Sequence, residues 1–227
     1  MVSQKKEENA TRRMFWICLF VFGLIVSWTL VCAADFYVIP TKKKNYAPVE
    51  KTGQTTCYDE PGNVINCLDT GQDGDIQAGV TWPDPRFTDN GDGTVTDNLT
   101  GLIWLKNANC DGTKTWADTL TYCNNLASGS CDLSDGSIAG DWRPPNIRGL
   151  HSLIHYGFYN PAVPNTAGTG KWTSGAPFTD VQSFLCWSST TYAGDTSYGW
   201  LVQMDDGYVA PDLKGDTGYV WPVRGGN

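Results

Sequence analysis

Histidine is scarce in this chain, and the motifs that gather zinc ligands or activate a serine are missing. The 227 residues include only two His, and no two cysteines stand in a Cys-x-x-Cys spacing. Zinc sites draw their ligands from closely spaced Cys and His, so a structural zinc ion is not expected. The sequence also lacks a Gly-x-Ser-x-Gly turn, which presents the nucleophile in one large class of hydrolases.

Charge is also sparse, whereas aromatic side chains are abundant. Charged residues make up only 18% of the chain, and the aromatic residues include ten Trp and ten Tyr. This much large apolar surface can fill a packed core, which excludes a disordered body. The 25 Gly and 12 Pro fall between short aromatic or β-branched runs. Such punctuation is typical of many short strands joined by tight turns, and it does not fit a helical bundle.

The N-terminal segment, residues 1–34, predicts export. Four basic residues precede an apolar run, Met14 to Cys32, and two alanines follow it. This order is typical of a signal peptide cleaved before Ala34. The alternative is an uncleaved inner-membrane anchor formed by residues 14–34, because the run is long enough to span a bilayer. A lipid anchor at Cys32 is less expected, since the preceding valine is bulkier than lipidation signals tolerate.

The charge of the remaining chain excludes one class of partner. Without residues 1–34 the sequence holds 12 basic and 22 acidic residues, a net charge of −10. A nucleic-acid partner is not expected, because its phosphates would be repelled. Contact with a membrane is expected only through the N-terminal segment. An acidic surface is ordinary for an exported protein, but carboxylates can also be gathered to hold a hard cation such as Ca²⁺.

Composition divides the exported part into three segments. Residues 35–53 contain three consecutive Lys and little apolar surface, and we expect a linker. Residues 54–85 form a Gly- and Asp-rich arm with two cysteines, Cys57 and Cys67. These cysteines flank a Pro-Gly-Asn turn, so they most simply close a hairpin on itself. Residues 86–227 form the main domain.

Turn residues and spacing predict the elements of that domain. Asn-Gly and Asp-Gly punctuation separates short strands near Phe87, at 94–96 and at 102–105. Helical spacing predicts one helix over 115–127, with Thr115 as its cap, and a second over 146–155. Four later stretches, LCWSSTTY, YGWLVQM, GYVAPDL and GYVWPVRGG, alternate as antiparallel strands do. The expected fold class is α+β, with curled antiparallel sheets and two helices.

The stretch RFTDNGDGTVTDNLTGLIW, which begins at Arg86, opens a longer pattern that resembles the Lcl C-terminal domain family. The resemblance covers roughly residues 52–226 in order. It implies a disulfide-stapled, C-type-lectin-like fold, and the family takes its name from a bacterial collagen-like adhesin. The positions that carry it are Trp116, Asp141 to Arg143, Pro145, Asn146, Arg148, Leu150, Leu153, Ile154, Trp187 to Ser189, Arg224 and Gly225.

Two positions depart from the family pattern. Pro144 stands where the pattern has Leu, and Gly149 stands where it has Glu. Glycine within a helix costs about 1 kcal/mol relative to Ala. The missing carboxylate also removes one candidate ion-pair partner or ligand, so a family site that used it would be weakened here.

The resemblance also implies the pairing of the other cysteines. Cys110 and Cys131 bracket the first predicted helix, and Cys123 lies within it. Lectin-like folds commonly join a helix cysteine to a late strand, which implies the pairs Cys110–Cys131 and Cys123–Cys186. A related lectin-like fold carries catalysis through a reactive cysteine. Here each cysteine beyond residue 34 has an expected partner, so no such nucleophile is expected and the chain is not predicted to be an enzyme.

Asp89, Asp92 and Asp97 offer a candidate Ca²⁺ site. Carboxylates at this spacing could wrap the ion with help from backbone carbonyls, although the sequence is not an EF-hand loop. The simpler interpretation is that Asn-Gly and Asp-Gly are hairpin turns. The same two interpretations, a Ca²⁺ site or a turn, apply to Asp73 with Asp75 and to Asp205 with Asp206.

Aromatic and polar residues between the late strands are candidates for ligand contact. Their rings could stack on a sugar and their polar groups could bind it. The namesake adhesin is associated with sulfated polysaccharide, but a charge of −10 argues against a polyanion here. The candidate ligands are therefore a neutral glycan or a cell-surface protein. The residues are Trp172, Tyr192, Tyr198, Asp205 and Tyr208.

Other polar residues have simpler expected roles. His151 and His155 would share a helix face, but no nearby carboxylate or Cys completes a metal site. The arginines 143, 148 and 224 are expected to pair with acids or cap carbonyls. The serines of WSSTT lack a neighbouring His and acid. We therefore expect an exported bacterial binding or adhesion module, in the periplasm, at the cell surface or secreted. The alternative is a structural, self-associating envelope protein.

Overall fold

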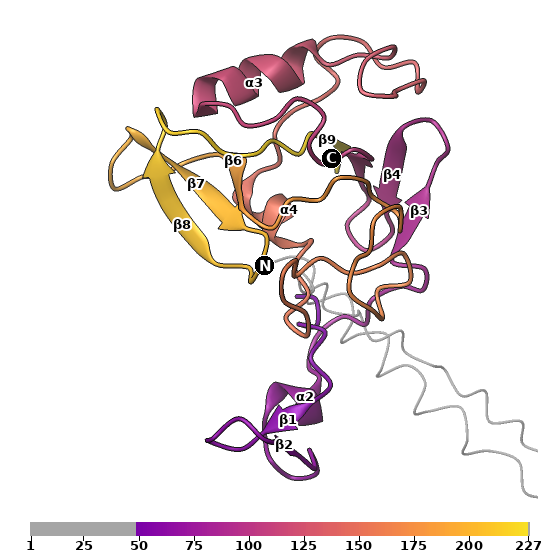
Figure 1. Cartoon of the computed structure of the whole chain (residues 1–227), viewed down its shortest axis with the longest axis vertical. Coiled ribbons are helices and arrows are strands. Elements are labelled where there is room, and N and C mark those ends of the chain that lie inside the picture. The colour runs from indigo at the N-terminus through magenta and orange to yellow at the C-terminus, as the bar shows by residue number, and fades with distance from the viewer. Residues whose placement is uncertain (1–48, 227) are drawn as a thin grey trace, which may run out of the picture. The chain divides into compact units, whose positions relative to one another are not determined.

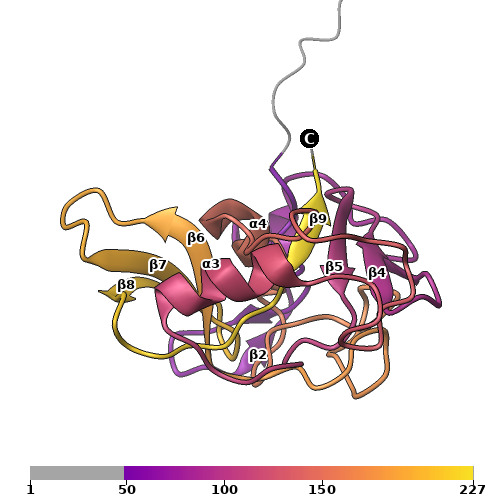
Figure 2. The same ribbon diagram turned by 90° about the horizontal axis from the view of Figure 1, so that it is seen from above.

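A four-stranded antiparallel sheet brings the end of the chain beside its early hairpins. The structure, a computed structural model, describes residues 49–226. The sheet order is β3 (Phe87–Asp89), β4 (Thr94–Asp97), β5 (Leu102–Leu105) and β9 (Val223–Gly225). The tight turns between β3, β4 and β5 lie at the Gly-rich positions that the sequence marks. Figure 1 shows the C-terminal strand β9 on the same side of the molecule as β3 and β4, and Figure 2 shows β9 beside β5, its partner in the sheet.

A second antiparallel sheet has three strands. These are β6 (Leu185–Thr191), β7 (Tyr198–Gln203) and β8 (Val209–Leu213), in that order. The pairing of β6 with β7 is irregular between Trp187 and Thr191. Pro211 lies in β8, an edge strand, where its missing N–H removes no inner ladder bond. The two sheets and the helices between them confirm the α+β class.

Two capped helices connect the sheets. Helix α3 (Trp116–Asn125) begins after Thr115, whose side chain accepts a hydrogen bond from the Asp118 amide. Helix α4 (Ile147–His151) begins after Asn146, whose side chain accepts from the Gly149 amide at 2.8 Å. The predicted end of this helix at residue 155 is wrong, because the amide of residue 155 bonds to a later loop, at the carbonyl of residue 162.

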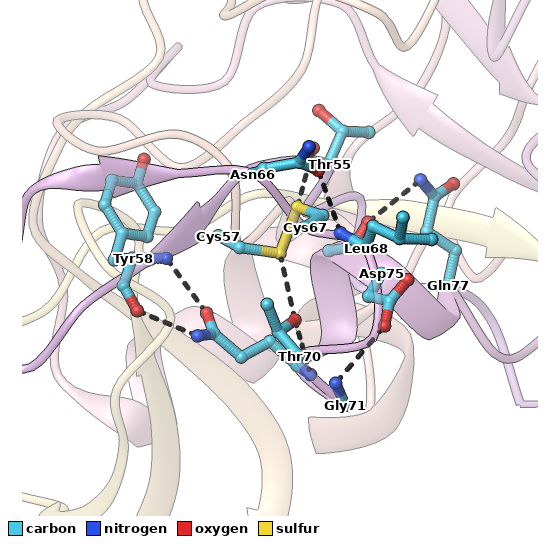
Figure 3. Close-up of a disulfide and its surroundings, with 12 residues drawn as sticks. Thr55, Cys57, Tyr58, Asn66, Cys67, Leu68, Thr70, Gly71, Asp75 and Gln77 are labelled. Atoms are coloured by element: carbon cyan, nitrogen blue, oxygen red, sulfur yellow. Dashed lines mark hydrogen bonds between the residues drawn. A yellow bond between two sulfur atoms is a disulfide. The ribbon is translucent and has the colours of Figure 1, made fainter.

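The arm has more structure than the sequence predicted. Strands β1 (Cys57–Tyr58) and β2 (Val64–Ile65) form a hairpin, and a short third helix, α2 (Asp73–Ile76), follows it. A disulfide joins Cys57 to Cys67 and ties the hairpin to the loop that precedes α2 (Figure 3). The arm belongs to the same compact unit as the two larger sheets.

Aromatic side chains form the centre of the main core. Trp221 contacts Trp104 at 5.6 Å and Phe178 at 4.8 Å between ring centroids, and Phe178 contacts Phe87 at 5.0 Å. All four rings are buried, and they come from β3, β5 and two late loops. A smaller cluster under α3 includes Trp142, Leu126 and Leu133. The core thus joins segments that are far apart in the sequence.

The cysteines require one correction. A second disulfide joins Cys110 to Cys131. The expected third one, Cys123–Cys186, is wrong for this structure, because both residues are free thiols. Burial raises the pKa of Cys186 to about 12, and burial together with the nearby Cys186 raises the pKa of Cys123 well above its usual range. Only thiolates react readily, so both buried thiols are expected to react slowly.

The predicted N-terminal segment lies outside the residues that the structure describes. The signal peptide or anchor at 1–34 and residues 35–48 of the linker lie outside them. Within residues 49–226, no helix is long and apolar enough to cross a membrane.

Candidate ligand-binding cavities

One cavity lies where helix α4 meets residues 49–52 and Gly226, which follows strand β9. Its volume is about 650 Å³. Helix α4 presents Arg148, Gly149 and His151 to it, and Asn146 and Ile154 flank the helix. The other lining residues are Val49, Glu50, Lys51, Thr52, Thr100, Leu102, Arg143, Ser152, Tyr156 and Gly226.

Local backbone bonds position the basic side chains of this cavity. Arg143 runs beside strand β9, because its amide donates to the Val223 carbonyl at 3.0 Å and its carbonyl accepts at 2.9 Å. The segment that carries Lys51 is held by its amide, which donates to the Val80 carbonyl at 3.1 Å. Arg148 follows the Asn146 cap on α4. Three separate segments therefore converge on one cavity.

The cavity has an excess of positive charge. Lys51, Arg143 and Arg148 line it, and Glu50 is the acidic residue among its lining residues. Within residues 49–226, four ion pairs form, and none of them includes these three cations. Arg143 donates to a backbone carbonyl, that of Gly225, at 3.0 Å. Basic groups without carboxylate partners are suited to an anionic ligand.

Tyr156 and His151 form the polar rim of the cavity. The Tyr156 hydroxyl lies 2.7 Å from Nε2 of His151. Burial and the negative charges of Asp206 and Glu50 raise the pKa of Tyr156, so its hydroxyl stays protonated near neutral pH. The Tyr156 hydroxyl can thus offer a neutral hydrogen bond beside the three cations.

A second cavity adjoins the first, because Lys51 and Tyr156 line both. Its volume is about 480 Å³. Trp82, Phe158 and Tyr58 give it aromatic walls, and the remaining lining residues are mostly Gly, Thr and Gln. Rings and neutral polar groups in one cavity are typical of sugar sites.

His155 lines the second cavity and contacts two of its aromatic side chains. Its ring contacts Trp82 edge-on at 4.7 Å and stacks on Phe158 at 4.0 Å. Burial, with a further contribution from the positive charge of Arg86, lowers the pKa of His155 to about 4. Its Nδ1 accepts a hydrogen bond from the Gly157 amide at 3.1 Å. A side chain at Gly53 would meet the ring, since a Cβ there would lie 2.3 Å from Nε2.

A third groove, beside α3, is a weaker candidate. Its volume is about 750 Å³, and it is lined by α3 and by the Cys110–Cys131 disulfide. Its cation, Lys114, already pairs with Asp111 at 2.5 Å and lies over the Tyr122 ring. This groove therefore offers no cation without a carboxylate partner.

The structure does not bring the predicted aromatic set together. Tyr192 and Tyr198 lie at the β6–β7 connection, whereas Asp205 and Tyr208 lie at the β7–β8 connection. These connections are at opposite ends of β7, about 20 Å apart for a six-residue strand. Trp172 packs against the core and donates to the Phe178 carbonyl at 3.1 Å. Of the predicted set, Tyr208 is the most exposed, at 61%.

The candidate Ca²⁺ ligands also have separate roles. Asp97 is fully buried and pairs with Arg86 at 2.8 Å. Asp89 pairs with Lys106 at 2.6 Å. Asp92 accepts hydrogen bonds from the amide and hydroxyl of residue 94 and so shapes the turn. In the part of the chain that the structure describes, no three Asp, Glu, His or Cys side chains are grouped to hold a metal ion.

The remaining predicted residues are used structurally. His151 and His155 do not share a helix face, because α4 ends at His151. Arg224 pairs with Asp135 at 3.0 Å, as expected of a closing strand. The hydroxyl of Ser188 donates to a backbone carbonyl at 2.6 Å and is buried.

Sequence reasoning missed Lys51, Trp82 and Phe158. Lys51 was placed in a linker, and the two aromatic residues carried no distinguishing pattern. Arg143 and Arg148 were named as pairing or capping residues, and Arg143 does donate to the Gly225 carbonyl, whereas Arg148 forms no ion pair within residues 49–226. Gly149, which replaces the Glu of the family pattern, was a local signal that Arg148 lacks a neighbouring carboxylate, but the absence of acids from other segments depends on tertiary structure.

Comparison with known proteins adds one finding. A family model described as the Lcl C-terminal domain matches residues 93–224. A comparison with curated proteins gives no match. The matched region contains α3, α4, Arg143 and Arg148 of the first cavity, and both larger sheets except β3 and the last residue of β9.

Proposed function

Because the chain belongs to the Lcl C-terminal domain family, we propose that it is an exported, non-catalytic binding module with a C-type-lectin-like fold. Its ligand places an anionic group in the cavity of Lys51, Arg143 and Arg148. We further propose that the ligand is a short acidic glycan on a cell surface or in the envelope.

One observation carries this proposal: three cations without carboxylate partners line one cavity of an otherwise acidic chain. Guanidinium groups bind carboxylates and sulfates through two parallel hydrogen bonds, which fixes the orientation of the ligand. Partial enclosure also limits screening by solvent. The expectation of a neutral ligand came from the net charge, which does not describe the local charge of this cavity.

Gly149 supports the same conclusion. The family pattern usually has Glu at this position, and Gly149 lines the cavity beside Arg148. A carboxylate there would compete with an anionic ligand for the cations. In this chain it is absent, so the two arginines remain available.

The size of the ligand follows from the two adjoining cavities. Volumes of about 650 and 480 Å³ are in the range of small-molecule sites. The aromatic walls of the second cavity could stack on a sugar ring beside the acidic one. A long polyanion is disfavoured, because the exported chain has a net charge of −10 and would repel its distant charges.

Calorimetric titration of the chain that follows residue 34 tests the proposal. The probes are short uronate-containing, sulfated and neutral oligosaccharides of matched length, each with Ca²⁺ and with a chelator. We expect saturable binding of the acidic oligosaccharides in both conditions. Equal binding of neutral and acidic probes would contradict the role of the cations. No binding of any probe would favour a structural, self-associating envelope protein instead.

A further inference from the structure

Several apolar side chains of the arm, residues 54–85, are exposed to solvent. Val64 is 70% exposed and Leu68 is 73% exposed, and Ile76 on α2 is exposed to a similar extent. Tyr58 and Val64 are direct cross-strand partners, so their side chains share one face of the hairpin. Such a concentration of apolar surface in a short, folded segment is typical of an interaction site.

The register of the hairpin leaves one strand edge open. Opposed residues of an antiparallel pair alternate between bonded and non-bonded pairs. The amide of Asp59 bonds to the Asn63 carbonyl at 3.0 Å, which makes that pair a bonded one. The next pair, Tyr58 with Val64, is therefore non-bonded, and the N–H and C=O groups of both residues point away from the hairpin.

The two outer edges differ in how these groups are satisfied. At β1, the side chain of Gln72 accepts from the Tyr58 amide at 3.0 Å and donates to its carbonyl at 2.8 Å. At β2, the outward N–H and C=O groups of Val64 form no hydrogen bond with any side chain or backbone group of residues 49–226. The β2 edge can thus accept a further strand, whereas the β1 edge is closed.

The charge of the arm specifies the kind of strand. Residues 54–85 contain six Asp or Glu and no Lys or Arg. A second copy of the arm would bring the same negative charge and would be repelled. A partner segment that alternates basic and aliphatic side chains would match both the charges and the exposed apolar surface.

The arm is also held in shape before any partner arrives. The Cys57–Cys67 disulfide closes the hairpin, and the Asp59 side chain accepts hydrogen bonds from both the backbone and the side chain of Asn63. A preformed edge loses little conformational entropy on binding. The arm, residues 54–85, lies before the residues that the family model matches, 93–224.

We propose that the β2 edge of the arm binds an extended segment of another protein by strand addition. The segment carries Lys or Arg in alternation with aliphatic residues. Its backbone pairs with the outward groups of Val64, its aliphatic side chains pack on Val64 and Leu68, and its basic side chains face the acidic residues of the arm.

Fluorescence anisotropy with three synthetic peptides tests this on the disulfide-bonded chain that follows residue 34. The first peptide alternates Lys and Val, the second has alternate backbone amides methylated, and the third replaces Lys with Glu. We expect saturable binding of the first, a loss of about tenfold or more with methylation, and no binding of the Glu peptide. Equal binding of all three, binding of none, or binding of lipid vesicles in place of the peptide would overturn the proposal.

Matched variants localise the site. Leu68→Ser should weaken binding of the Lys-Val peptide, and Leu213→Ser, the same change at a leucine of β8 that is 44% exposed, should not. Val64→Pro should also weaken it, because proline removes the outward N–H without removing a bond of the hairpin. Equal effects of Leu68→Ser and Leu213→Ser would overturn the proposal. Binding of acidic oligosaccharides should be unchanged by Leu68→Ser, which separates this surface from the cavities.

Discussion

Arg86 and Asp97 form a two-bond ion pair that solvent does not reach. The Nε–Oδ1 distance is 2.8 Å and the Nη2–Oδ2 distance is 2.9 Å, and neither side chain has exposed surface. Arg86 also donates to the Ser152 carbonyl at 2.9 Å. The pair thereby ties strand β4 to the segment that follows α4, next to both cavities.

Removing one partner of this pair should destabilise the protein strongly. Asp97→Asn leaves a buried, uncompensated guanidinium, which costs about 3 to 5 kcal/mol. Asp89→Asn breaks the partly exposed pair with Lys106 and should cost about 0 to 1 kcal/mol. Urea unfolding of both variants measures the difference. Similar losses in the two variants would contradict the buried role of Asp97.

Charge at position 149 should control anion binding. Gly149→Glu places a carboxylate beside Arg148 and should weaken binding of acidic oligosaccharides by about tenfold or more. Gly149→Gln has a similar size and helix preference without the charge, and should bind nearly as the parent does. A Cβ at this position meets no atom closer than 3.4 Å, so both variants should fold. Calorimetry compares them, and equal affinities would count against the cationic cavity.

Loss of Arg148 should give the complementary result. Arg148→Gln removes a cation from the cavity and should reduce affinity for the acidic probes by about tenfold. Lys171→Gln removes the same charge at a site where Lys171 donates to backbone carbonyls outside the cavity. Its affinity should be unchanged. If both variants lose affinity equally, the effect reflects net charge rather than the cavity.

Stability should decrease below neutral pH because of His155. Its pKa is about 4 in the folded chain, against an ordinary value of 6.5. Between these values the unfolded chain binds the proton and the folded chain does not, so unfolding is favoured as pH falls through this window. The expected loss is about 1 to 2 kcal/mol. Urea unfolding at pH 7 and pH 5 should show a smaller pH difference for His155→Gln, and an unchanged difference would contradict the shift.

The buried cysteines should be detectable by thiol counting. In the chain that follows residue 34, a thiol reagent should label no cysteine rapidly under native conditions and two after unfolding without reductant, Cys123 and Cys186. Full reduction should release the four cysteines of the two disulfides as well. A count of zero in the unfolded, unreduced chain would instead indicate a third disulfide.

Features specified by neighbouring residues were predictable from the sequence. Thr115 was predicted as the cap of α3, and its side chain does bond to an amide of the first turn; the start of α4 was predicted at residue 146, which is its cap. Asn-Gly and Asp-Gly pairs mark the turns of the first sheet. The Cys57–Cys67 pair is close in the sequence and flanks a turn, so a local closure is the simplest pairing.

Features that depend on distant residues were not predictable in the same way. Asp97 lies in a turn-like sequence, which is compatible with binding a cation from solution. Nothing near it in the sequence indicates that its partner is instead Arg86, across the hairpin. The first cavity combines residues 51, 143 and 148, which are brought together by strand β9 and by the bridge at residue 80. The aromatic prediction assumed that these side chains are exposed and close together. Trp172 instead packs against the core, and the tyrosines lie near opposite ends of β7.

The position of β9 has a consequence for how the protein is made. Its partner β5 emerges from the ribosome well before it, and the chain runs through α3, α4 and the whole second sheet in between. Trp221, at the centre of the core, arrives only just ahead of β9. The first sheet cannot be completed, nor its core closed, until this late strand has been synthesised. The growing chain therefore stays incompletely folded until its late residues are made, a state that is compatible with the export proposed for it.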